Sequence, residues 1–472
     1  MLLFTILVVL ILGVMCFLMS VMRMHIKRFA YDVTRDYYYD CLSQHFVARL
    51  EGGVIKLPQE VDINDTVLAA VSVETSWLGK WLLPYIEIET RKGIWKHYIE
   101  YGGRGVRYLN FSDMFDAESR EIFLRGRRVS LENQEVRLTV YPRMSLDDKK
   151  ILVLAPHADD AELAAYGLYE KYAENAMVVT VTASEAGRFH YENLFSKRCP
   201  TETKEQYLEK GRMRVWNSLT VPLLAGVSSE NILQLGFFDT TLKTLYNNPE
   251  REIPSAKLET ADVGIFRRAN KSAISEGLHG GSNWHDLVDN MAYVIESFRP
   301  DVIVTPSPNI DVHTDHQCTT IAAVEALKKL NYTNGSLFLY TVHYLTDDYP
   351  LGNVGATLSL PPFFSEEGSS DMLYFHSIYS HPVDKKTQNR KLLALDAMND
   401  IRPNARNYMD WKYVLRKGLS LLYHDLTSIR SDLISRFVRS NEFFMLFLSV
   451  MSTIRKLTRK LFPGAGRIIC ID

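Results

Sequence analysis

The pattern of apolar and polar positions changes character several times along the chain. Between about residues 45 and 146, short segments alternate apolar with polar side chains, as residues 66–73 and 85–90 do. This alternation is the period of a strand with one buried face. The glycine pairs Gly52-Gly53 and Gly102-Gly103 are turn signals between such segments. The pattern predicts a small, antiparallel β-sandwich-like domain.

From Lys149 onward, apolar runs of strand length alternate with longer segments of helical period. Alternating strands and helices are typical of βαβ units, so we expect an α/β fold: a Rossmann-like, mostly parallel sheet with flanking helices. Residues 245–283 are polar and contain glycine, which predicts a long loop over the site. The strands are expected at 151–154, 177–182 and 302–305, and the helices at 160–174, 204–219, 287–298 and 319–330.

The N-terminal pattern differs from both of these regions. Residues 1–22 carry no charged side chain, and at about 1.5 Å per residue a helix of this length crosses a hydrocarbon core of about 30 Å. Arg23, Lys27 and Arg28 follow, so the positive-inside rule places the main body on the cytoplasmic side. A cleaved signal peptide is the alternative, disfavoured because no basic residue precedes the run and no small-x-small cleavage site follows it. We expect a membrane-anchored, single-pass protein with a cytoplasmic catalytic domain.

The C-terminal region joins an apolar run at 443–448 to a basic stretch at 455–460. This combination predicts a helix within residues 441–462 that lies on an anionic leaflet or packs on its own domain. The chain is thus divided into a transmembrane anchor (1–28), a β-rich accessory domain (29–148), a catalytic domain (149–400) and a helical C-terminal region (401–472).

Composition narrows the class of function. A length of 472 residues suggests more than one domain, and a net charge of −2 gives no reason to expect a nucleic-acid partner. The five cysteines stand apart without a CxxC pair, which argues against a disulfide scaffold and a cysteine zinc ribbon.

Two polar clusters follow two of the expected strands. Residues 157–160 read His-Ala-Asp-Asp after the first strand, and residues 311–316 read Asp-Val-His-Thr-Asp-His after a later one. In open α/β sheets, ligands bind at the carboxyl ends of the strands, so the two clusters are expected to meet. Imidazole and carboxylate groups suit Zn²⁺, which in catalytic sites keeps three protein ligands and an open position. Each cluster alone also has a simpler interpretation, a helix cap or a polar turn.

We assign a role to each side chain of the two clusters. The expected zinc ligands are His157, Asp160 and His316, and Asp159 is then free to act as general base. His313 would polarise a carbonyl or protonate a leaving nitrogen, and Asp315 would fix the tautomer of a histidine.

The two clusters together resemble the PIG-L or LmbE-like family of zinc-dependent deacetylases. The resemblance covers about residues 149–400 and rests on His157-Ala158-Asp159-Asp160-Ala161-Glu162 and His313-Thr314-Asp315-His316. It implies zinc on His157, Asp160 and His316, with Asp159 as the base and His313 at the carbonyl oxygen or leaving amine.

The resemblance extends to three residues expected to bind substrate. Asp239 ends a segment that resembles one near the substrate in the family, and Arg214 lies where many members carry a substrate-binding arginine. At position 217 this chain has Asn where the family has Glu. Arg188 is expected to reach the substrate, whereas His343 and His381 stand singly and are not counted as ligands.

The resemblance implies a hydrolase that removes the acetyl group from N-acetylglucosamine (GlcNAc) units and releases acetate. The expected anchor favours a membrane-associated glycolipid or a polysaccharide or lipopolysaccharide precursor as substrate. Three alternatives remain: a zinc amidase for a small soluble glycoside or a non-sugar amide, a membrane-tethered glycan-binding protein with an inactive site, and a nucleotide-sugar glycosyltransferase.

Overall fold

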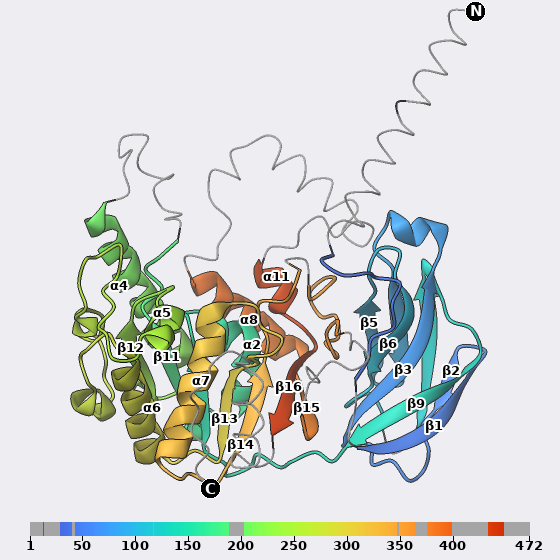
Figure 1. The fold of residues 1–472 in the computed structure, drawn as a ribbon. Coiled ribbons are helices and arrows are strands. Elements are labelled where there is room, and N and C mark those ends of the chain that lie inside the picture. Colours follow the sequence, from blue (N-terminus) through green and yellow to red (C-terminus); the bar gives the residue numbers. More distant parts are fainter. Residues whose placement is uncertain are drawn as a thin grey trace, which may run out of the picture.

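The computed structural model describes residues 13, 29–39, 43–116, 118–187, 203–346, 349–363, 375–398 and 433–447. Two β-sheets lie side by side, and the helices gather around the second (Figure 1).

The first sheet contains nine strands, all of whose pairings are antiparallel. Its inward side chains, among them Leu50, Val71 and Ile88, form a core of their own. The strands are β1 (Gln44–Glu51), β2 (Val54–Lys56), β3 (Thr66–Thr75), β4 (Tyr85–Thr90), β5 (Gly93–Tyr98), β6 (Arg104–Asn110), β7 (Glu121–Arg127), β8 (Val129–Ser130) and β9 (Gln134–Tyr141), with a 3₁₀ turn η1 (Trp77–Lys80).

This sheet corrects the expected sandwich. Hydrogen bonding runs without a break through the order β5-β4-β7-β2-β1-β9-β3-β6, with β8 paired to β3. The strands therefore form one continuous sheet. The glycine pair at the β1–β2 turn was correctly identified: Gly53 has φ of +85°, and an added Cβ would lie 2.9 Å from the Leu124 carbonyl oxygen.

The second sheet contains seven strands in the order β12-β11-β10-β13-β14-β16-β15. The pairings from β12 to β14 are parallel, whereas β16 pairs antiparallel with both β14 and β15, so the sheet is mixed. The strands are β10 (Ile151–Ala155), β11 (Ala176–Thr182), β12 (Ile232–Phe237), β13 (Val302–Pro306), β14 (Ser336–Tyr340), β15 (Ser377–Pro382) and β16 (Asn441–Phe447).

Every residue of β10, β11, β12, β13 and β14 is buried, as expected for a sheet whose two faces are covered by helices. The helices are α2 (Asp160–Lys171), α4 (Lys204–Thr220), α5 (Leu242–Asn247), α6 (Trp284–Phe298), α7 (Thr314–Lys329), α8 (Lys385–Ala397) and α11 (Leu433–Phe437), with 3₁₀ turns η2 (Ala173–Asn175), η3 (Val221–Ala225), η4 (Ser229–Asn231), η5 (Val263–Phe266) and η6 (Ala273–Gly277). The α/β pattern expected from residue 149 is thus present, and the expected long loop contains short helical turns.

The expected transmembrane helix and single-pass, membrane-anchored localisation are not supported. Among the residues that the structure describes, no helix is both long enough and apolar enough to cross a membrane. This finding corrects the fold class and the localisation. Residues 1–28, to which the anchor was assigned, lie outside the described residues apart from Gly13.

The prediction of a helix within residues 441–462 is wrong for the first seven of these residues. Residues Asn441–Phe447 form β16, which lies inside the sheet between β14 and β15. Six of its seven side chains are buried, and in Figure 1 the strand lies inside the sheet, with β15 between it and the first sheet. Residues 448–462 lie outside the described residues.

Polar contacts join the two sheets. The Asn110 side-chain amide, at the end of β6, donates to Ser380 Oγ on β15 at 2.9 Å. The Ser380 backbone N–H donates to Thr66 Oγ1 on β3 at 3.2 Å. The β15 edge of the second sheet is therefore covered by the first sheet.

A candidate metal centre

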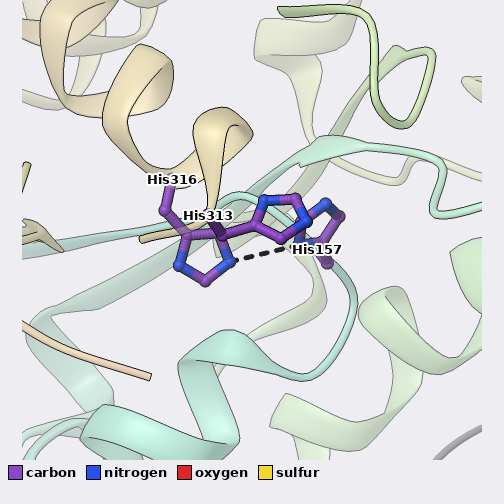
Figure 2. Close-up of side chains that lie close together, drawn as sticks. All are labelled: His157, His313 and His316. Carbon is purple, nitrogen blue, oxygen red and sulfur yellow. Dashed lines mark hydrogen bonds between the residues drawn. The ribbon is translucent and has the colours of Figure 1, made fainter. Parts of the chain in front are cut away.

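Three histidines from two loops meet at the carboxyl edge of the parallel strands. His157 follows β10, and His313 and His316 lie at the start of α7, after β13 (Figure 2). The His157 ring centroid lies 4.8 Å from that of His313 and 5.2 Å from that of His316. Because β10 and β13 are neighbouring parallel strands, their ends bring the two sequence clusters together.

Three donor atoms of this cluster form a nearly equilateral triangle. Asp160 Oδ2 lies 3.2 Å from His157 Nδ1 and 3.1 Å from His316 Nε2. The two histidine nitrogens are 3.3 Å apart. A tetrahedral Zn²⁺ with bonds of about 2.0–2.1 Å needs ligand atoms about 3.3–3.4 Å apart. The donor set and its spacing therefore fit zinc.

Carboxylates behind the two histidines fix the orientation of each ring. Asp311 Oδ2 lies 3.0 Å from His316 Nδ1 and also accepts from the backbone N–H groups of Val342 and His343 at 3.0 and 3.1 Å. With Nδ1 bonded to Asp311, Nε2 of His316 points into the triangle.

His157 is held in the same way from its other nitrogen. Its Nε2 lies 3.1 Å from Asp239 Oδ1 and 3.5 Å from Asp315 Oδ2, which leaves Nδ1 facing the triangle. Asp315 is itself fixed, since its carboxylate accepts from the backbone N–H groups of Thr240 at 2.7 Å and Leu242 at 3.3 Å.

The electrostatics of the cluster favour a cation. Burial alone would lower the pKa of His316, but the carboxylates of Asp160 and Asp311 raise it to about 9. Burial opposes a charge on His157 too, yet Asp239 leads a group of carboxylates that raise its pKa well above the ordinary value. Burial would raise the pKa of Asp160, but His316 and His157 hold it well below its usual range. A site that attracts protons this strongly also attracts a metal cation.

Asp159 stands at the N-cap position of α2 without making the capping bond. Its Oδ2 instead lies 3.1 Å from Nη2 of Arg214 on α4, and both side chains are largely buried. A charged, hydrogen-bonded partner limits the carboxylate to few rotamers, which is the condition for a positioned base.

His313 presents one nitrogen to the site. It is the N-cap of α7, and its Nδ1 accepts from the Asp315 backbone N–H at 3.3 Å. The proton of the neutral ring is therefore assigned to Nε2. Burial, with His157 and His316 as charged neighbours, lowers the pKa of His313 to about 4. The ring is therefore a neutral hydrogen-bond donor in the metal-free protein.

Two residues that lie at this site, His343 and Asp311, had received no role from the sequence pattern. His343, just after β14, has its ring centroid 5.1 Å from that of His313 and 4.8 Å from that of His316. Asp311 was part of the second cluster but received no role. Arg214 contacts Asp159 and Asp239 contacts His157 in the structure, and their expected role in binding substrate stays a prediction. Arg188 lies outside the described residues, and His381 is buried on β15 with Nε2 3.2 Å from the Gly167 carbonyl oxygen.

Comparison with known proteins gives a family for part of the chain. Residues 152–327 match the sequence model of the PIG-L family, described as GlcNAc-PI de-N-acetylase. A comparison with curated proteins gave no match.

Among the solved structures that resemble part of this chain are two that are each 15% identical to it. One is the N,N'-diacetylchitobiose deacetylase of Pyrococcus horikoshii, with a TM-score of 0.34 over 68% of this chain and 90% of the other. Another is the 4-carboxy-2-hydroxymuconate hydratase of Pseudomonas putida KT2440, with a TM-score of 0.30 over 63% of this chain and 95% of the other. At these scores neither likeness carries an argument about activity.

Proposed function

From the match of residues 152–327 to the PIG-L family model, we propose that the protein is a zinc-dependent N-deacetylase of this family. The proposed reaction hydrolyses the acetamide of a GlcNAc-type residue to acetate and a free amine. The observation that carries the proposal is the triangle of Asp160 Oδ2, His157 Nδ1 and His316 Nε2, whose sides of 3.1–3.3 Å fit zinc.

The proposed site supplies a base and a hydrogen-bond donor. Zinc, when bound, supplies a Lewis acid for the carbonyl oxygen and lowers the pKa of a water molecule. Asp159, held by Arg214 at 3.1 Å, takes the proton from the water that attacks the acetyl carbon. His313 donates through Nε2–H to the oxyanion that develops on the acetamide oxygen. Breaking the C–N bond then requires the proton held by Asp159 to pass to the leaving nitrogen.

The family description supports an acetylated glucosamine unit as the group that reacts. The larger molecule that carries it, a glycolipid or a polysaccharide or lipopolysaccharide precursor, stays a prediction from sequence. A zinc amidase for soluble amides would use the same residues, so only substrate tests separate it from the proposed function. The other two alternatives are a glycan-binding protein and a glycosyltransferase. Neither needs an aspartate, Asp159, that is fixed by an arginine beside three donor atoms spaced as zinc ligands are.

The test combines metal content with acetate release. Purified protein is measured for zinc and assayed with a panel of GlcNAc glycosides and lipid-linked GlcNAc, with and without a chelator. We expect about one zinc per chain and acetate release that the chelator abolishes and added zinc restores. Release from non-sugar amides alone would favour the amidase. Bound glycan without acetate release in the zinc-loaded protein would contradict the enzyme.

A further inference from the structure

Helix α2, which has Asp159 at its N-cap and Asp160 at its first position, is broken near its middle. Ala165 has φ of −138° and ψ of +17°, outside the helical range. A residue with this backbone interrupts the ladder of i→i−4 hydrogen bonds, so N–H groups beyond it need other acceptors. The break therefore divides the helix into a short first part at the candidate metal centre and a second part farther from it.

A carboxylate from another element accepts from N–H groups beyond the break. Oε1 and Oε2 of Glu442, on β16, accept from the backbone N–H groups of Gly167 and Leu168, each at 2.8 Å. The Gly167 carbonyl oxygen accepts from Nε2 of His381 on β15 at 3.2 Å, so both backbone groups of Gly167 are held. An added Cβ at Gly167 would lie 2.9 Å from Val383 Cγ2 and 3.3 Å from Glu442 Oε2. A glycine therefore allows the carboxylate to approach the helix this closely.

The charge of Glu442 is matched inside the protein. Lys391, on α8, donates from Nζ to Oε1 of Glu442 at 2.8 Å, and the two side chains are 1% and 2% exposed. A carboxylate removed from water to this degree needs a cation and hydrogen-bond donors to remain charged, and this one has both. Both residues lie outside the segment 152–327 that matches the family. One buried ion pair thus joins β16 and α8 to α2 at the point where α2 breaks.

The break lies close to the donor atoms of the metal centre. Ala165 is five positions after Asp160, which is about 7.5 Å along a helix at about 1.5 Å per residue. Asp160 Oδ2 lies 3.2 Å from His157 Nδ1 and 3.1 Å from His316 Nε2, so a change of direction at the break would move a zinc ligand. A displacement of about 1 Å at such a site can cost about 100-fold in rate.

We propose that Glu442 is a positioning residue for the metal centre: its carboxylate fixes the break in α2 and thereby the place of Asp159 and Asp160. The inference rests on the proposed function for the roles of these two aspartates. It adds that β16, a strand outside the matched segment, controls the geometry of the centre.

The test uses Co²⁺ as a visible probe, because its absorption spectrum depends on the arrangement of its donor atoms. In Glu442→Gln one carboxylate oxygen becomes an NH₂ group, which cannot accept from a backbone N–H. We expect a changed Co²⁺ spectrum and a zinc affinity about 10-fold lower. We also expect kcat to fall about 10- to 100-fold with little change in KM, because the substituted residue does not lie among the groups proposed to bind the sugar.

A double variant separates positioning from stability. Glu442→Gln leaves the Lys391 ammonium without its carboxylate in the interior, which lowers stability for that reason alone. Glu442→Gln/Lys391→Met removes this charge, so we expect the free energy of unfolding to recover in part while the spectrum and kcat remain altered. Recovery of the wild-type spectrum and kcat together with stability would overturn the positioning role.

Arg390→Gln is the matched control, because Arg390 on α8 pairs with Glu170 on α2 and so connects the same two helices beyond the break. It should change neither the spectrum nor the zinc affinity. The spectrum needs no turnover, so the comparison decides the inference even if no donor releases acetate, a result that would contradict the proposed function alone. A wild-type spectrum and zinc affinity in folded Glu442→Gln would overturn the inference.

Discussion

At the scale of single residues, the clearest prediction concerns Asp159, which is one of two adjacent aspartates with different surroundings. Asp160 belongs to the metal triangle, whereas Asp159 pairs with Arg214. Asp159→Asn keeps the shape and the hydrogen-bonding capacity but removes the base. We expect normal zinc content and a fall in kcat of about 10²–10⁴-fold, measured by acetate release and elemental analysis. Full activity in this variant would exclude Asp159 as the base.

Asp311 gives a second prediction at this scale. It holds His316 through Nδ1 at 3.0 Å and also fixes the loop after β14. Asp311→Asn should lower zinc affinity about 10- to 100-fold, as loss of a partner behind a ligand commonly does, measured by competition with a chromophoric chelator. Asp289→Asn is the control, because Asp289 pairs with Lys329 at the surface. Unchanged affinity in Asp311→Asn would mean that the orientation of His316 does not depend on this carboxylate.

At the scale of elements, the sequence predicted the helices and strands that have a clear period over neighbouring residues. The buried runs of β10, β11 and β13 and the helices α2, α4 and α6 are present, because strand and helix periods need only neighbouring residues to be recognised. The pairing of strands joins residues that are far apart in the sequence, so the sequence pattern did not show which strand ends meet. His343 joins the cluster because β14 lies beside β13, and a histidine just after an apolar run was the available signal. The role of Asp311 depends on the same pairing. The strand β16 was expected to be helical because its apolar run is followed by basic residues, and a short apolar run fits either element.

The assignment of β16 as an internal strand can be tested by its core packing. Phe444 is fully buried, and its ring centroid lies 5.8 Å from that of Phe338 on β14. Phe444→Ala should lower the free energy of unfolding by about 3–5 kcal/mol, measured by denaturant titration. Phe123→Ala is the control on an exposed strand position, where less than about 1 kcal/mol is expected. Similar small losses at both positions would contradict a buried strand.

At the scale of the whole molecule, the metal centre couples pH to stability. In the metal-free protein, His316 has a pKa of about 9, above its ordinary value, because Asp160 and Asp311 outweigh burial, and the pKa of His157 is shifted in the same direction. A raised folded-state pKa contributes stability that is fully present below the unfolded value of about 6.5 and is lost as pH rises toward the folded value. The metal-free protein should therefore lose stability between about pH 6.5 and about pH 9, as protons leave carboxylate-bound histidines.

The zinc-loaded protein should respond differently over the same range. A bound metal replaces the protons on these histidines, and its affinity rises as fewer protons compete. We expect the gap in Tm between zinc-loaded and chelator-treated protein to widen from about pH 6.5 to about pH 9, measured by calorimetry at matched ionic strength. In His316→Ala the widening should be smaller, since one of the two titrating nitrogens is absent. A gap that stays constant or narrows with rising pH would show that these histidines do not exchange protons for the metal, and the cation preference inferred from the surrounding carboxylates would then be wrong.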